Sequence, residues 1–141
     1  MIKVGSHIKS TSLLDGSYFE NATILIVENN VDGAVGFVVN RPFGRSLNEL
    51  TEFSKSKSFP LLEGGPVDQE HIYVLHSRPD LIKGGQPVTD NKYFGGSMQE
   101  VIHAINVKDV SENEIQLFLG YCGWDADELE MEVEEGSWTV V

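Results

Sequence analysis

The sequence has little cysteine, no long apolar run and, over its last quarter, no basic residue. Its single cysteine, Cys122, excludes an intramolecular disulfide and is typical of a protein kept in a reducing compartment. No apolar run reaches the ~20 residues that a membrane-spanning helix requires. The first residues also lack the apolar segment of a secretory signal peptide. The sequence therefore predicts a cytoplasmic protein that makes no membrane contact.

Basic residues are absent from residues 109–141, which hold 10 acidic side chains. Residues 1–108 hold 12 acidic and 10 basic side chains, so most of the net charge of −12 lies in the last quarter of the chain. Such a surface repels nucleic acid and anionic lipid, so direct nucleic-acid binding is not expected. The acidic face either keeps the protein soluble or docks a basic partner.

A pair of apolar runs, residues 23–27 and 34–39, is the strongest structural signal in the chain. They flank residues 28–33, a loop that contains Asn, Asp and Gly, and are therefore predicted to pair as antiparallel strands. The first run is apolar on both faces, which predicts burial on both sides of a sheet. Gly36 in the second run predicts a bulge or a close approach of backbones. With 141 residues, the chain is expected to form one domain, residues 1–141, around this pair.

Three segments predict helices. Residues 98–105 carry apolar side chains at i, i+3, i+4 and i+7. Residues 47–54 follow an S-x-x-E capping box. The third segment begins at Asp125, a good N-cap, and ends before Gly136.

Further strands are expected at residues 72–75 and 114–119, with weaker strand signals at residues 2–9 and 138–141. Residues 120–124 contain two glycines and predict a tight turn. Strands and helices alternate irregularly. The predicted fold class is therefore α+β: a single compact domain with a mixed, mainly antiparallel sheet and about three helices packed on it.

Two segments are predicted to be irregular. Pro42 is expected to end strand pairing after residues 34–39, because proline cannot donate a backbone hydrogen bond. Residues 77–92 are rich in turn-forming residues and contain too little apolar sequence for a second domain.

Cys122 is the one candidate nucleophile. The turn predicted at residues 120–124 would place it at a strand-to-helix junction, where a helix N-terminus lowers the pKa of a thiol. The pattern departs from G-x-S-x-G at Trp124, and spacing identifies no base, so an inert, half-buried thiol is the alternative interpretation. The four histidines show no metal-ligand spacing, although His76 ends a strand and could line a pocket. No catalytic set, metal site or cofactor motif is predicted.

Four blocks of the sequence occur in an order typical of one family. They are residues 19–42, ending in G-A-V-G-F-V-V-N-R-P; the G-G-P-V of residues 64–67 with Leu75-His76 after it; the G-Y-C-G-W of residues 120–124; and residues 129–138. Together they resemble the YqgE/AlgH family of bacterial proteins over residues 13–138. The resemblance implies an α+β fold of unusual topology, a cytoplasmic location and no established biochemical activity. A transcriptional-regulator label circulates for the family without a recognised DNA-binding motif behind it.

The chain departs from the family pattern in two respects. Cys122 stands where the family usually has alanine, which argues against a cysteine chemistry common to the family. Relatives usually continue for some tens of residues beyond the position of Trp138, so contacts made by that tail are expected to be missing. The family also accepts Lys or Arg at the position of Arg41, which favours a simple positive charge there over a bidentate contact.

Three functions remain open from the sequence. The first is a non-enzymatic binding or regulatory domain that acts through a protein or small-molecule partner of unknown identity. Its contact surface is expected near the loop ends of the sheet, at Asn40, Arg41, His76, Tyr121 and Trp124. The second is a small-molecule hydrolase or redox enzyme that uses Cys122 or His76. The third is a transcriptional regulator, which the net charge disfavours.

Overall fold

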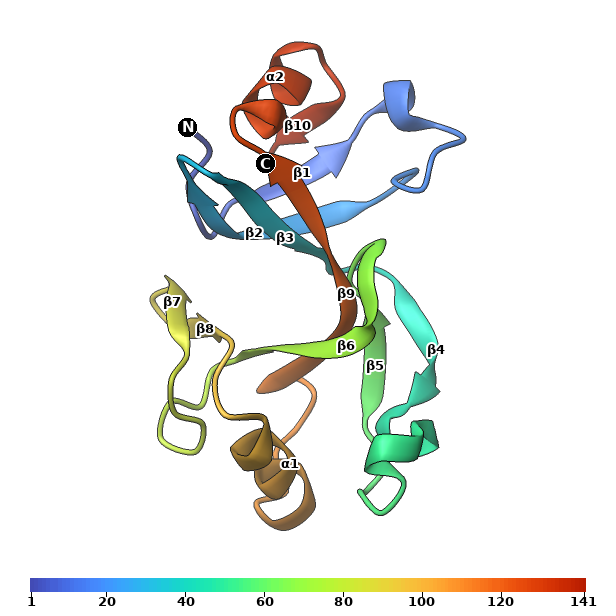
Figure 1. Ribbon diagram of the computed structural model, residues 1–141, viewed down its shortest axis with the longest axis vertical. Helices are drawn as coiled ribbons and strands as arrows, with labels where there is room; N and C mark the ends of the chain where they lie inside the picture. Colours follow the sequence, from blue (N-terminus) through green and yellow to red (C-terminus); the bar gives the residue numbers. More distant parts are fainter.

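Ten strands form one sheet that folds back on itself as two stacked halves, each covered on its outer face by an α-helix (Figure 1). The computed structural model describes residues 1–141. The strands are β1 His7–Ser10, β2 Thr23–Asn30, β3 Gly33–Val38, β4 Pro42–Ser46, β5 Pro60–Glu63, β6 Val67–His76, β7 Gln86–Thr89, β8 Lys92–Phe94, β9 Ile115–Asp125 and β10 Trp138–Val140. The helices are α1 Met98–Val107 and α2 Glu128–Glu134, and the 3-10 turns are η1 Ser12–Leu14, η2 Leu47–Glu49 and η3 Thr51–Phe53.

The strand order is β10-β1-β2-β3-β9-β6-β8-β7, with the β4–β5 pair attached beside β9. All neighbours are antiparallel except β5 and β9, which are parallel. The upper half in Figure 1 contains β1, β2, β3 and β10, and the lower half contains β4 to β8. The predicted mixed, mainly antiparallel sheet of an α+β protein is therefore confirmed, with two α-helices in place of about three.

The predicted apolar hairpin forms the centre of the upper half. β2 and β3 pair antiparallel, and residues 24–27 are all buried, as expected for a strand covered on both faces. β2 continues to Asn30, so the link is the two-residue turn 31–32 and not the predicted six-residue loop. Gly36 lies where the backbone of the neighbouring strand comes close: a Cβ there would be 2.9 Å from the Leu25 carbonyl oxygen. The predicted close approach is confirmed.

Residues 120–124 do not form the predicted tight turn, because they lie inside β9. The first part of β9 pairs with β5 and β6 in the lower half, and its last part pairs with β3 in the upper half. The strand bends at Gly120, whose φ is 74°. Partner strands satisfy the backbone groups of this segment, and that pairing overrides the local turn preference of its glycines.

The link between β5 and β6, which contains Gly64 and Gly65, packs closely against the backbone of β9. The Gly64 N–H donates to the Leu119 carbonyl at 2.8 Å, and the Gly64 carbonyl accepts from Val38 N–H at 2.8 Å. A Cβ on Gly65 would be 2.1 Å from the carbonyl carbon of Tyr121. No side chain fits here, so the Gly-Gly pair allows the two halves to share β9.

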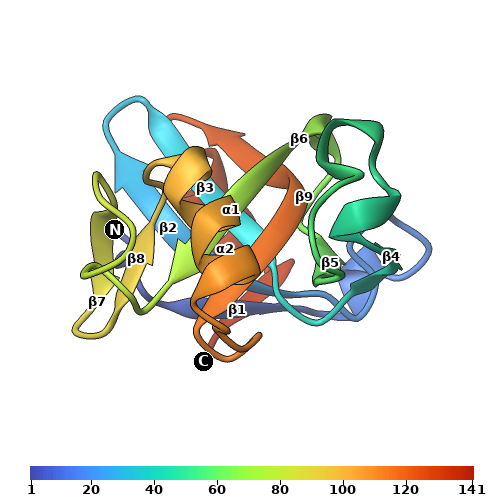
Figure 2. The same ribbon diagram turned by 90° about the horizontal axis from the view of Figure 1, so that it is seen from below.

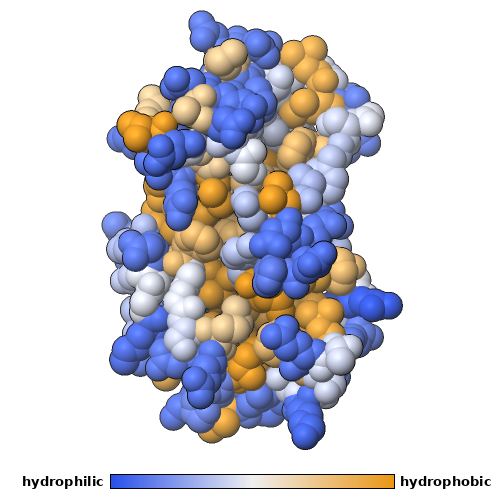
Figure 3. All heavy atoms as spheres, viewed as in Figure 1, coloured by the Kyte–Doolittle hydropathy of each residue, from blue (hydrophilic) through white to orange (hydrophobic).

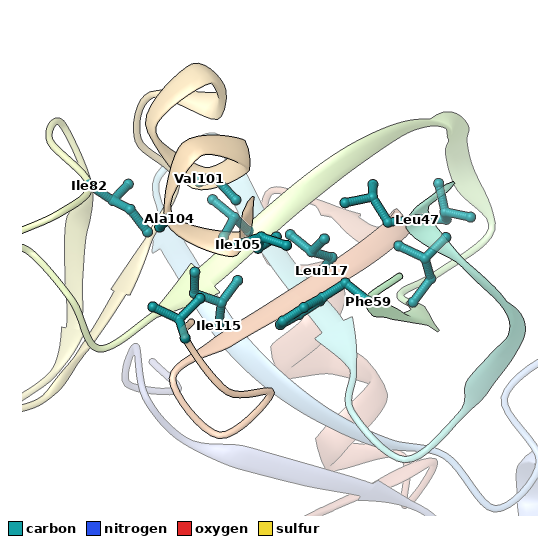
Figure 4. Packing of buried hydrophobic residues seen from close by; sticks show 12 residues of the cluster. Leu47, Phe59, Ile82, Val101, Ala104, Ile105, Ile115 and Leu117 are labelled. Atoms are coloured by element: carbon teal, nitrogen blue, oxygen red, sulfur yellow. The ribbon is translucent and has the colours of Figure 1, made fainter. Parts of the chain in front are cut away.

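Helix α1 forms over the predicted residues and covers the lower half (Figure 2). The Ser97 hydroxyl caps it by accepting from Glu100 N–H at 3.3 Å. Val101, Ala104 and Ile105 are buried against apolar side chains of the sheet, and Figure 4 shows these helix residues facing the start of β9. The 3.6-residue periodicity read from the sequence is therefore the packing face of the helix.

Residues 47–54 are not an α-helix but two 3-10 turns, η2 and η3. The predicted capping box is present, since the Glu49 carboxylate accepts from Ser46 N–H at 2.8 Å. Leu47, Leu50 and Phe53 recur every three residues, which matches the three residues per turn of a 3-10 helix. All three pack against the core under α1, so their spacing favours the tighter winding.

Helix α2 starts two residues later than predicted, with Asp127 instead of Asp125 at the N-cap. Because β9 extends through Asp125, the helix begins at Glu128, after Asp127. Asp127 adopts a left-handed conformation and makes no side-chain cap. Leu129 anchors the helix in the core of the upper half.

Two strand segments fall where irregular structure is predicted. Pro42 does not end pairing, because it begins β4, which pairs with β5. Gln86–Thr89 and Lys92–Phe94 form the hairpin β7–β8 within the turn-rich region. Pro42 in β4 and Pro87 in β7 lie on edge strands, where the missing donor can face away from a partner. Neither α-helix has the length and apolar character needed to cross a membrane.

Candidate functional site

A hollow opens between the two halves of the sheet, where aromatic side chains of the central core reach the surface. Its volume is about 230 Å³. It is lined by Glu28, Val35, Phe37, Tyr73, Phe94 and Tyr121. Figure 3 shows hydrophobic residues gathered at the waist between the halves. We call the hollow lined by these six residues the aromatic hollow.

Strand periodicity produces the aromatic hollow. Alternate side chains of β3 point to opposite faces, so Val35 and Phe37 face the lower half while Ala34 and Val38 face α2. The lower half contributes Tyr73 from β6 and Phe94 from β8, and β9 contributes Tyr121 near its bend. Glu28 comes from β2, so five strands contribute to one site.

The rings hold one another in fixed orientations. The Tyr73 and Tyr121 rings meet edge to face, with centroids 5.5 Å apart. Phe37 meets Phe94 edge to face at 5.5 Å and stacks on the buried Phe118 at 4.6 Å. Such contacts are favourable beyond simple burial, so the lining of the hollow is preorganised.

The one charged residue that lines the aromatic hollow, Glu28, is acidic. Glu28 is exposed, and its carboxylate makes no hydrogen bond or ion pair with the rest of the chain. At the outer end of Tyr73, the Asp68 carboxylate accepts the tyrosine hydroxyl and also bonds His71 Nδ1 at 2.6 Å. Burial, followed by this hydrogen bond, raises the pKa of Tyr73 to about 12. The hydrogen bonds from Tyr73 and His71 lower the pKa of Asp68. Asp68 therefore stays ionised beside the Tyr73 hydroxyl, where it is paired with His71.

Asn40 and Arg41 lie together, but away from the aromatic hollow. The Asn40 side-chain oxygen accepts from Thr23 N–H at the start of β2, and its amide nitrogen donates to the Asn21 carbonyl. The Arg41 guanidinium lies over the Tyr18 ring, 4.9 Å from its centroid, and donates to the Glu20 carbonyl at 2.8 Å. It is also 3.9 Å from Glu63 Oε2, which accepts the Tyr18 hydroxyl at 2.6 Å. This pair fastens the loop before β2, and the charge of Arg41 is largely matched within the chain.

His76 is buried at the end of β6, with 2% of its surface exposed. Its Nδ1 accepts from Arg78 N–H at 3.1 Å, while its buried Nε2 has no hydrogen-bond partner. The ring stacks on Tyr93, with centroids 5.7 Å apart. Burial lowers the pKa of His76, so the imidazole is neutral inside the fold.

Trp124 is buried in the core of the upper half, under α2. Its Nε1–H donates to Glu132 Oε1 at 3.1 Å, and the Trp138 Nε1–H donates to the same oxygen at 2.9 Å. One carboxylate on α2 thus satisfies two buried indoles. Of the five residues predicted to share a contact surface, only Tyr121 lines the aromatic hollow. Asn40 and Arg41 form a separate cluster, and His76 and Trp124 are inside the protein.

Cys122 does not lie at a strand-to-helix junction, because β9 continues past it. Its thiol is buried and donates to the Gly64 carbonyl, with Sγ 3.4 Å from the oxygen. Burial raises the pKa of Cys122 to about 12. No group of three or more His, Cys, Asp or Glu side chains is arranged to hold a metal ion.

Three other depressions are larger but less suited to a ligand. The largest, about 610 Å³, lies between η3 and α1, and only two of its nine lining residues are hydrophobic. One of about 400 Å³, beside β4 and the start of β5, has one hydrophobic residue among its seven lining residues. The third, about 290 Å³, lies beside β5 and the start of β9. None of them combines converging rings with an unpaired charge, so the aromatic hollow is the better candidate site.

Five of the six lining residues were not predicted from the sequence: Glu28, Val35, Phe37, Tyr73 and Phe94. Each looks like an ordinary strand or loop residue in its own segment. One usable signal was the prediction of a strand at residues 34–39. Side chains alternate between the faces of a strand, which places Val35 and Phe37 opposite the neighbours that face α2.

Comparisons with known proteins agree on one family. A family profile described as AlgH-like matches residues 7–141. A UPF0301 protein of Chlorobium luteolum is 38% identical over 131 residues, which are 93% of this chain and 69% of that protein. A UPF0301 protein of Cytophaga hutchinsonii is 30% identical over 141 residues, which are 99% of this chain and 78% of that protein.

Solved structures show the same fold. The solution structure of the AlgH protein from Pseudomonas aeruginosa matches with a TM-score of 0.77 and 24% identity, over 97% of this chain and 75% of that one. A crystal structure of a Corynebacterium diphtheriae protein matches with a TM-score of 0.77 and 15% identity, over 100% and 76% of the two chains. The resemblance to the YqgE/AlgH family is confirmed, and this chain belongs to the AlgH-like family.

Proposed function

We propose that this protein is a non-enzymatic, cytoplasmic binding domain whose ligand site is the aromatic hollow. The carrying observation is the convergence of three half-buried aromatic rings, Tyr73, Phe94 and Tyr121, over the buried Phe37 and beside a single unpaired carboxylate. Largely apolar concavities with a few polar groups are where proteins bind small molecules or partner side chains. The single cysteine, unpaired and buried, supports the cytoplasmic location.

The proposed site predicts where probes bind. In ¹H–¹⁵N spectra, titration with indole, cyclohexanol, butylammonium and butyrate should shift the backbone amides of Val35, Tyr73 and Phe94 with at least one probe. Tyr121→Ala should abolish that response because it removes one wall. Tyr93→Ala is the matched control, since Tyr93 is also half-buried but lies outside the hollow. Shifts confined to the depression near Ile102, or none with any probe, would contradict the proposal.

The environment of Cys122 weighs against a cysteine-dependent hydrolase or redox enzyme. A thiol with a pKa of about 12 holds almost no thiolate near neutral pH. We expect iodoacetamide at about pH 8 to label native Cys122 at least about a hundredfold more slowly than the denatured chain. Labelling is followed by mass spectrometry, with free cysteine as reference. Equal native and denatured rates would revive the enzymatic alternative.

Direct nucleic-acid binding also fits poorly with the proposed domain. Duplex affinity comes largely from cations that neutralise phosphates, and the chain carries a net charge of −12. The lining of the aromatic hollow contains no Lys or Arg. A regulatory role would therefore act through a protein or small-molecule partner.

A further inference from the structure

We infer that the aromatic hollow binds an alkylammonium group, an inference that rests on the proposed binding function. Four of its six lining residues are Phe or Tyr. Tyr73, Phe94 and Tyr121 are half-buried and can meet a ligand, while Phe37 is buried beneath them. The face of an aromatic ring carries partial negative charge and attracts a cation placed within about 6 Å of its centre. Several rings around one volume are the arrangement by which proteins bind quaternary and methylated ammonium groups.

The charges at the hollow favour the same class of ligand. Glu28 lines it and has no partner elsewhere in the chain, so its carboxylate is available to a cation. Asp68 does not line the hollow. Beside the Tyr73 hydroxyl it is paired with His71, whose pKa it raises. Glu28 is therefore the carboxylate left for a cation. No lining residue is cationic, so an anionic ligand would meet repulsion without a compensating donor.

The size of the hollow limits the ligand. Its volume of about 230 Å³ is below the roughly 300–1,000 Å³ of sites that take drug-sized ligands. It suits a small head group or the end of one side chain. The preorganised ring contacts reduce the ordering that binding requires.

Choline and 3,3-dimethyl-1-butanol provide the test, because they have nearly the same shape and differ in charge. Binding to the full chain is followed by ¹H–¹⁵N spectra at low salt, with the site read from the amides of Val35 and Phe94. We expect choline to bind at least about fivefold more tightly than its neutral isostere. Equal affinities would overturn the cation inference while leaving the hollow as a binding site.

Glu28→Gln separates the carboxylate from the rings. It should weaken choline binding by about threefold to tenfold and leave the neutral isostere unchanged. Asp32→Asn is the matched control, because Asp32 is an exposed carboxylate on the same hairpin that does not line the hollow. An equal loss with both variants would reduce the effect to overall charge and overturn the assigned role of Glu28.

A peptide with one trimethyllysine distinguishes a protein-borne group from a free small molecule. Tighter binding of the peptide than of choline, at the same amides, would indicate a protein partner. Tighter binding of choline would indicate a small molecule. If neither shifts the amides of the aromatic hollow while indole or butyrate does, the ligand class is wrong and the site stands. If no probe shifts them, the proposed function falls as well.

Discussion

Replacing Gly120 with alanine is expected to destabilise the protein by about 2–5 kcal/mol. Gly120 has a φ of 74°, a left-handed conformation that costs an L-residue about 1–2 kcal/mol. A Cβ there would also be 2.4 Å from the Gly65 carbonyl oxygen and 2.9 Å from the Val67 carbonyl oxygen. Those oxygens belong to backbone, so the clash is relieved only by moving β6 or β9, and overpacking of this kind typically costs about 1–3 kcal/mol.

Gly16→Ala is the control that separates the two contributions. Gly16 has a similar φ of 83°, but a Cβ there would meet no atom within 4 Å. It should therefore lose only the conformational part, about 1–2 kcal/mol. Urea unfolding of both variants measures the difference. If Gly120→Ala is no worse than Gly16→Ala, the glycine contact at β9 is not the tight junction described above.

This stretch of β9 also shows why part of the fold is not predictable from the sequence. Residues 120–124 contain two glycines, which locally favour a turn, yet they form a strand because β3 and β6 pair with them. The strands β3 and β6, which are distant in sequence, therefore decide that residues 120–124 are extended. The hairpin of β2 and β3 is predictable because its apolar runs and turn residues lie within one stretch, and α1 is predictable because its packing face is written in its own periodicity.

The error at residues 120–124 carries over to the candidate site. In a turn, Tyr121 and Trp124 can meet on one surface. In a strand, successive side chains alternate, so Cys122 and Trp124 enter the core under α2 while Tyr121 faces the aromatic hollow. His76 is hidden for a different reason, because the segment after β6 folds back and Tyr93 stacks on its ring. Which side chains converge on the hollow depends on strand order, and no local pattern encodes that order.

Truncating Phe37 to alanine is the second large expected effect, a loss of about 3–5 kcal/mol in the free energy of unfolding. Phe37 is 0% exposed and lies between the halves of the sheet. Its ring stacks on Phe118 at 4.6 Å and meets Phe94 at 5.5 Å. Alanine would leave a cavity that the two halves cannot close, because β9 and its glycine contact fix their separation.

Phe43→Ala is the matched control, since Phe43 is a phenylalanine on the edge strand β4 with 37% of its surface exposed. Its truncation should change stability by about 0.5 kcal/mol or less. Both variants are compared by urea unfolding with the slope monitored, because an altered slope would mean that more than a cavity had been introduced. A loss at Phe37 as small as that at Phe43 would show that the halves can collapse around the missing ring. The contact between them would then be too loose to hold a preorganised hollow, and the argument for a ligand site there would lose its structural basis.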